Sequence, residues 1–235
     1  MSPYETWRRH FEQNRLRPLP AVDAPELPRA QHLALARSLA RFQLGESGEG
    51  RIAHEIDRVE GVDAEYRAAL KLFVAEEGRH AAILARMVQA LGGALLQRSW
   101  TERLFVHARR LFGVRFKLLV LLAAEVIGIG FYGMLSGAVP SGALAQALEQ
   151  ICGDEEAHLR FHCQFLASQP ALLRLMWRPL GTAAALTVLW DHRATLRAFG
   201  ISLRAAAALM LGRVREAALR LQGAPARIQL ASSQI

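Results

Sequence analysis

The sequence predicts an all-α protein built on a four-helix bundle, and three observations lead to that prediction. Hydrophobic residues make up 52% of the 235 residues, which allows a sizeable core and excludes a disordered chain. Apolar side chains recur at steps of three and four in four long segments, as they do along amphipathic helices. Tight turns join these segments in two pairs, and the longer stretch 94–113 joins the pairs.

We expect three parts along the chain. Residues 1–27 are rich in proline and should form an arm wrapped on the surface, with a short helix between Tyr4 and Asn14. Residues 28–169 hold the bundle. Residues 170–235 should form a C-terminal helical extension, interrupted where proline and glycine occur.

The first long helix is expected from Pro28 to about Val59, because proline suits a first helical turn. Its apolar face is interrupted by Glu46 and Glu49. A turn at Gly61 follows, in which Asp63 can cap the next helix.

The second helix is expected over residues 64–90, until Gly92 and Gly93 stop it. Its apolar face contains only two polar side chains, Glu77 and His80. Residues three apart share one helix face, so this Glu-x-x-His pair can bind one metal ion. Taken alone, such a pair is more often a satisfied ion pair in a core.

The third helix, at about 114–135, is the most apolar, with Glu125 at its centre. Its length approaches that of a membrane span, which we keep as a minor alternative. Glu125 argues against that alternative, because a carboxylate in lipid is costly and no second span accompanies it. The middle helix of a large bundle is equally apolar all round.

The fourth helix is expected from the turn at 140–142 to about Ala167, before Pro170. It repeats the pattern of the second helix, with Glu155 and His158 three apart on the apolar face. His162 follows one turn later. After Pro170, the clearest amphipathic segment is 203–221.

The spacing of these residues around the turns is consistent with one shared site. Gly61 lies midway between Glu46 and Glu77, so the two carboxylates should face each other across the first hairpin. Pro140 lies midway between Glu125 and Glu155, which repeats the arrangement. The stretch between the hairpins is long enough to cross the length of the bundle, which is ferritin-like connectivity.

Residues 30–167 resemble the ferritin-like di-iron carboxylate proteins. Segment 42–47 looks like the first-helix segment of rubrerythrins, and segments 45–52 and 124–128 are similar to the demethoxyubiquinone hydroxylases. Segment 154–159, with Tyr132 seven residues after Glu125, looks like the aldehyde-deformylating oxygenases. The resemblance implies six metal ligands: Glu46, Glu77, His80, Glu125, Glu155 and His158.

The resemblance further implies a cofactor of two Fe ions, with Mn or a mixed Fe/Mn pair as alternatives. It implies a non-haem oxidase or monooxygenase that uses O2, an external electron donor and an apolar substrate of lipid, quinone or aldehyde type. Tyr132 could donate a proton there or belong to the core. Gly128 and Gly130 should leave room for a cleft lined by Ile129, Phe131, Tyr132 and Leu135.

Two other functions stay open at this point. The first is oxidation or storage of iron, or detoxification of peroxide, as in ferritins and rubrerythrins. Two cysteines are too few for the rubredoxin module of peroxidase-type rubrerythrins, and ferritin lacks the second His, so the pattern favours an oxygenase. The second is a metal-free helical scaffold.

Several neighbouring residues are weaker candidates. Glu49 could replace Glu46 as ligand or pair with an arginine. His162 and Asp154 could support the site or serve the core and the surface. Glu76 and Glu156 fall off the apolar faces and are expected at the surface.

Cysteine usage indicates a cytoplasmic protein. Cys152 and Cys163 lie three helical turns apart, too far for a disulfide with each other, and the chain opens with no signal-peptide pattern.

The net charge is +8, and all but two of the 29 basic residues are Arg. No nucleic-acid motif accompanies them. Peripheral contact with the inner face of the membrane, and a homodimer, stay open.

Overall fold

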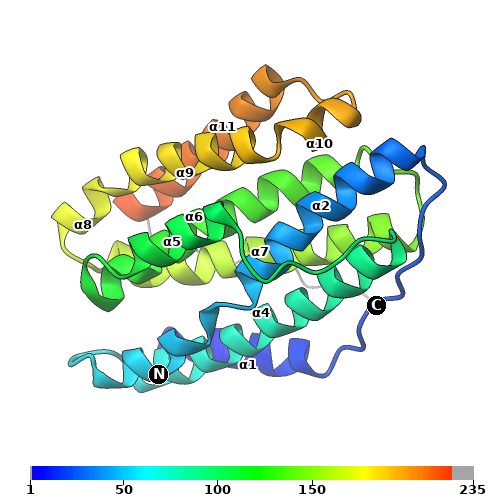
Figure 1. Cartoon of the computed structure of the whole chain (residues 1–235). Helices are drawn as coiled ribbons and strands as arrows, with labels where there is room; N and C mark the ends of the chain where they lie inside the picture. Colours follow the sequence, from blue (N-terminus) through cyan, green and yellow to red (C-terminus); the bar gives the residue numbers. More distant parts are fainter. Residues whose placement is uncertain (1, 224–235) are drawn as a thin grey trace.

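The computed structural model describes residues 2–223, apart from the side chain of Glu49, and these residues are helical with no strand (Figure 1). The all-α prediction is therefore confirmed. The α-helices are α1 (Glu5–Arg15), α2 (Arg29–Glu46), α3 (Ile52–Glu55), α4 (Ala64–Ala90), α5 (Trp100–Arg109), α6 (Gly113–Ser136), α7 (Ala143–Ala167), α8 (Ala171–Leu175), α9 (Trp177–Asp191), α10 (Arg193–Ala198) and α11 (Leu203–Gln222).

Two helical hairpins form the centre of the molecule. Helix α2 packs against α4, α6 packs against α7, and α4 meets α7 between the two pairs (Figure 1). The Asp63 side chain accepts from the backbone N–H groups of Glu65 and Tyr66, so the predicted cap at the start of α4 is present. Helix α5 lies in the connection between the hairpins and packs on α6.

The first long helix is shorter than predicted. It ends at Glu46, and short helical turns, two of them 3₁₀ (Glu49–Arg51 and Ile56–Arg58), replace its expected second half up to Val59. Gly45, Gly48 and Gly50 explain the break, because glycine is about 1 kcal/mol less favourable than alanine in a helix. Glu46 therefore lies at the end of a helix rather than in its middle.

Helix α6 is the one described helix long and apolar enough to cross a membrane. Most of it is buried against α5, α7, α9 and α11. A buried position inside a helical protein accounts for its composition. Gly130 allows α11 to approach, since a Cβ there would lie 3.2 Å from Met210 Cγ.

The N-terminal segment is more than a surface arm. Helix α1 packs on α4 and buries Trp7 and Phe11, each 2% exposed. The Trp7 indole N–H also donates to the Gln164 side chain on α7 at 2.7 Å. At the other end of the chain, α9 and α11 cover α6, while α10 packs on α2.

Candidate metal centre

Four of the predicted ligands meet in the core between α4 and α7. Glu77 and His80 come from α4, Glu155 and His158 come from α7, and each offers one ligand atom within 4.8 Å of the others. All four side chains are buried. The two Glu-x-x-His pairs thus face each other and could hold a metal ion.

The two remaining predicted ligands lie beside this cluster. A carboxylate oxygen of Glu125, on α6, is 3.4 Å from His158 Nδ1. Glu46, at the end of α2, lines the same pocket as Glu77, Glu125 and Glu155. The structure therefore brings all six side chains together, and their role as metal ligands stays a prediction.

The carboxylates of this cluster lie close enough to perturb one another. Burial and the charges of Glu77 and Glu155 hold the pKa of Glu46 well above its usual range. Burial and the same two neighbours raise the pKa of Glu125 in the same way. Burial disfavours a charged imidazole, yet Asp154 and Glu155 raise the pKa of His80 to about 10. The cluster therefore keeps protons that a metal ion would replace.

Two buried atoms of the cluster lack a hydrogen-bond partner among the described residues, namely Glu77 Oε1 and His80 Nδ1. The nearest oppositely charged atoms, His158 Nδ1 and Glu155 Oε1, lie 3.0 and 3.2 Å away, but the geometry is not that of a hydrogen bond. Buried polar atoms are rarely left unsatisfied. Both are ligand types that divalent iron or manganese accepts, so the residues fit a metal site.

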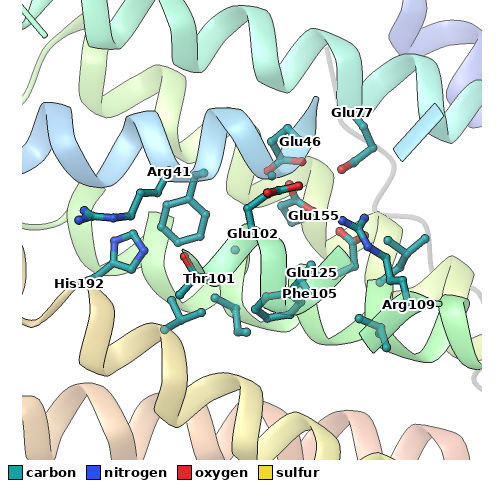
Figure 2. Close-up of a pocket in the computed structure, with 18 residues that line it drawn as sticks. Arg41, Glu46, Glu77, Thr101, Glu102, Phe105, Arg109, Glu125, Glu155 and His192 are labelled. Atoms are coloured by element: carbon teal, nitrogen blue, oxygen red, sulfur yellow. The ribbon is translucent and has the colours of Figure 1, made fainter. Parts of the chain in front are cut away.

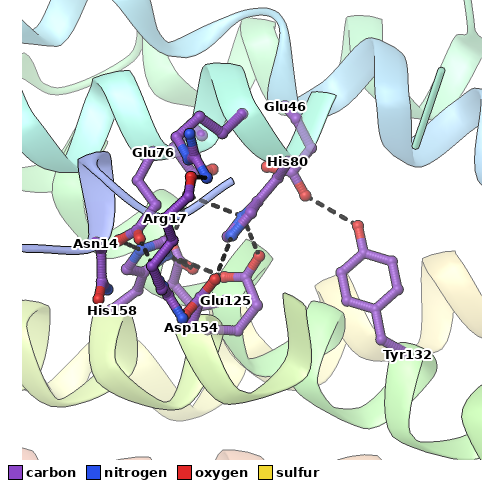
Figure 3. Close-up of polar contacts among 12 residues, drawn as sticks. Asn14, Arg17, Glu46, Glu76, His80, Glu125, Tyr132, Asp154 and His158 are labelled. Atoms are coloured by element: carbon purple, nitrogen blue, oxygen red, sulfur yellow. Dashed lines mark hydrogen bonds and ion pairs between the residues drawn. The ribbon is translucent and has the colours of Figure 1, made fainter. Parts of the chain in front are cut away.

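Each imidazole is oriented by an acid from the opposite helix. His80 Nε2, on α4, lies 3.4 Å from an Asp154 oxygen, and His158 Nε2, on α7, lies 3.0 Å from a Glu76 oxygen (Figure 3). The Nδ1 atoms of both rings are thereby turned toward the carboxylate cluster. Such outer hydrogen bonds fix the ring and make it a better metal ligand.

An arginine from the N-terminal segment joins these two acids. The Arg17 guanidinium donates to Asp154 at 2.6 Å and to Glu76 at 3.2 Å (Figure 3). Burial alone would raise the pKa of Glu76, but the hydrogen bond with His158 and the charge of that ring lower it. The pKa of Asp154 is lowered against burial by His80 and then Arg17. Both acids therefore stay ionised.

The prediction that Glu76 lies at the surface is wrong, because its side chain is only 4% exposed. Asp154 likewise points inward. Arg17 was not predicted at all. One signal could have found the acids: in both copies of the motif an acidic residue directly precedes the glutamate. Glu156 is partly exposed and pairs with Arg213, and the Glu49 side chain lies outside the described part of the structure.

A pocket leads from the surface to the carboxylates. Its walls come from α2, α5, α6 and α9, and its empty volume is about 800 Å³ with open solvent at the mouth included (Figure 2). Glu46, Glu77, Glu125 and Glu155 lie at its inner end. Most of the wall is apolar and consists of Phe42, Gly45, Phe105, Val120, Leu121, Ala124, Ile127, Gly128 and Val188.

The predicted lining of this cleft is wrong in part. Gly128 does border the pocket, but Gly130 faces α11 instead, and Ile129, Phe131 and Leu135 are buried in the core. The lining residues of α6 lie on another face of the helix.

Tyr132 is buried beside the centre and outside the pocket lining. Its hydroxyl donates to Glu46 Oε1 at 2.9 Å (Figure 3). Burial and the charge of Glu46 hold the pKa of Tyr132 well above its usual range, so the phenol stays protonated. It can therefore hold the Glu46 carboxylate in place.

His162 is fully buried one turn beyond His158. Both of its ring nitrogens lack a hydrogen-bond partner among the described residues, and Nε2 lies 3.8 Å from a Glu125 oxygen. Burial and the charge of His158 lower the pKa of His162 to about 3, so the ring is neutral. The neutral ring of His162 therefore lies beside Glu125, one of the predicted ligands.

Comparison with protein-family models, with curated proteins and with solved structures returns no match for the chain. The site therefore rests on its own geometry.

Proposed function

We propose that this chain is a ferritin-like di-iron carboxylate enzyme that uses O2 to oxidise an apolar small molecule. One observation carries the proposal: a largely apolar pocket leads from the surface to four carboxylates, two of which form a buried cluster with two oriented imidazoles. An external electron donor and a cytoplasmic setting belong to the same proposal.

In this proposal the six side chains hold two iron ions. His80 would bind one ion and His158 the other, through the Nδ1 atoms that Asp154 and Glu76 turn inward. Four carboxylates would balance the charges of two divalent ions. Bound ferrous iron supplies the electrons with which such sites activate O2.

The protein's own residues would do three further things. The apolar wall would bind the carbon body of a substrate and exclude water from the inner end. Tyr132 would hold Glu46 through a hydrogen bond and stay protonated. Arg17 would hold the two acids behind the imidazoles through hydrogen bonds, so that both rings keep their orientation.

The pocket favours an organic substrate over iron storage. A path for iron ions would be lined with carboxylates from the surface inward. Apart from the four predicted ligands, the lining here carries aromatic and aliphatic side chains, the guanidinium groups of Arg41 and Arg109, the polar side chains of Thr101 and His192, and a single acid, Glu102. An apolar molecule suits such a wall better than a hydrated cation does.

Metal content tests the first half of the proposal. After anaerobic loading with ferrous iron and desalting, the full chain should keep close to two metals, and exposure to O2 should produce an optical spectrum of oxidised iron. The variants Glu77→Ala and His158→Ala should lose metal. Glu156→Ala, one residue from a predicted ligand but paired with Arg213, is the matched control and should keep both ions. A full complement in all three variants would refute the ligand assignment.

Filling the pocket tests the second half. Ala124 lies in the pocket wall on α6, next in sequence to Glu125, and its small side chain is exposed there. Ala124→Phe should keep two metals but lose turnover of any organic substrate found for the wild-type chain. Unchanged turnover with an intact metal count would show that substrates do not enter through this pocket.

A further inference from the structure

The end of the pocket away from the carboxylates carries polar groups of its own. His192, Arg41 and Thr101 line the pocket away from the carboxylate cluster (Figure 2). The Phe42 ring lies between the two ends, with its centroid 4.8 Å from that of His192 and 5.1 Å from that of Tyr132. A ligand that reaches the carboxylates along this wall therefore also meets His192 and Arg41.

A chain of hydrogen bonds defines which nitrogen of His192 carries the proton. Thr195 Oγ1 lies 2.8 Å from the Ala34 carbonyl oxygen, which can only accept, so Thr195 donates its proton there. Ser38 Oγ, 2.7 Å from Thr195 Oγ1, must then donate to it.

Because Ser38 has given its only proton to Thr195, it must accept from the next group. That group is His192 Nδ1, at 2.8 Å, which therefore carries a hydrogen. The ring itself is neutral, since burial lowers the pKa of His192 to about 3. A neutral imidazole has one N–H, so Nε2 of His192 is an acceptor.

A donor lies close to this acceptor. Arg41 Nε and His192 Nε2 lie 3.3 and 3.9 Å from the same oxygen of Asp191. Asp191 is itself held by Trp100 and Thr101, each at 2.9 Å, so the arrangement is fixed. Arg41 also donates to the Arg37 carbonyl, and a guanidinium has five donors, so others remain for a ligand.

We propose that His192 and Arg41 form a subsite for a hydroxyl group, so that the substrate is an apolar molecule ending in an alcohol or phenol. The hydroxyl would donate to His192 Nε2 and accept from Arg41, while the carbon body lies along Phe42 toward Glu46. An ether or a bare hydrocarbon of the same size cannot donate to the acceptor. This subsite rests on the proposed function in that it assigns a substrate class to the same pocket.

Binding of two matched probes to the full chain tests the subsite. 4-Propylphenol and 4-propylanisole differ in the hydroxyl hydrogen, which a methyl group replaces, and isothermal titration calorimetry gives both Kd values. We expect the phenol to bind about tenfold more tightly, the effect of one hydrogen bond to a buried acceptor. Equal affinities, or no binding of either probe, would overturn the subsite.

Variants identify the groups responsible. His192→Phe keeps an aromatic ring beside Phe42 and should abolish the preference for the phenol. Leu121→Ala, in the apolar wall, is the control and should weaken both probes equally. Persistence of the preference in His192→Phe would refute the role of His192. The ring ¹⁵N shifts of the unaltered chain give a test without any variant, and a proton on Nε2 would refute the assignment.

These measurements need no bound iron, so their outcome is separate from that of the proposed function. A chain that prefers the phenol but holds no metal would refute the iron chemistry and leave the subsite. A chain that holds two metals but binds both probes equally would refute the subsite and leave the iron chemistry.

Discussion

Arg17 is the residue through which the N-terminal segment reaches the candidate metal centre, and its removal should weaken both stability and metal binding. Arg17→Met keeps the aliphatic stem and deletes two charge-assisted hydrogen bonds, to Asp154 and Glu76. A hydrogen bond to a charged group contributes about 1.5–3 kcal/mol. The Arg17 side chain is 40% exposed, so solvent screens part of this.

We therefore expect Arg17→Met to lower the free energy of unfolding of the metal-free protein by about 2 kcal/mol. Both acids keep their histidine partner in the variant, which limits the loss. For a chain of this size, such a change corresponds to a fall in Tm of about 4–8 °C. Differential scanning calorimetry measures it directly.

Metal affinity should fall as well, because Asp154 and Glu76 orient His80 and His158. Loss of a direct outer partner of a metal-bound histidine typically costs 10- to 100-fold in affinity. Arg17 acts one contact further out, so we expect a loss of up to about tenfold, measured by competition with a chelator. Arg15→Met, at an exposed position at the end of α1, is the matched control. If both variants keep wild-type affinity and stability, Arg17 does not support the centre.

Three further predictions concern single side chains at the site. Tyr132→Phe should retain two metals and lose about 1 kcal/mol of stability, the net contribution of its hydrogen bond to Glu46, as chemical denaturation would measure. His162→Leu should make the metal-free protein more resistant to acid. The folded pKa of His162, about 3, lies below its unfolded value of about 6.5, so the stability it contributes is present above pH 6.5 and lost as the pH falls toward 3. Chemical denaturation gives the free energy of unfolding at pH 6.5 and at pH 5. The decrease between these two pH values should be smaller in the variant than in the wild type, by up to about 2 kcal/mol. Asp154→Asn should weaken metal binding more than Arg17→Met does, because Asp154 contacts His80 directly, and equal losses in a chelator assay would contradict this order.

The convergence of the six predicted ligands could be read from the sequence because helical periodicity determines which side chains share a face. Glu77 and His80 on α4 and Glu155 and His158 on α7 each occupy the position of an apolar residue. Because the two glutamates of each hairpin lie equally far from its turn, they lie at the same level along the bundle. The shortened α2 did not disturb this, since Glu46 is still its last residue.

The same periodicity misplaced Glu76. It lies next to Glu77 and thus about 100° around α4, which in a bundle of four helices is a position open to solvent. The structure buries it because α1 packs on α4 and brings Phe11 within 5.7 Å of the His158 ring, measured between centroids. A Pro-rich segment has no period from which such a contact could be predicted, so Arg17 could not have been found by this route.

The error about the cleft was different, because elementary geometry could have prevented it. Gly128 and Gly130 are two residues apart, which places them about 200° apart around a helix, so both cannot border one cavity. Positions four apart do share a face. Val120, Ala124 and Gly128 follow that spacing, and two of the three are small residues on either side of Glu125 in the sequence. Small residues at this spacing beside a buried glutamate leave space next to the carboxylates, and such space distinguishes a pocket from a filled core.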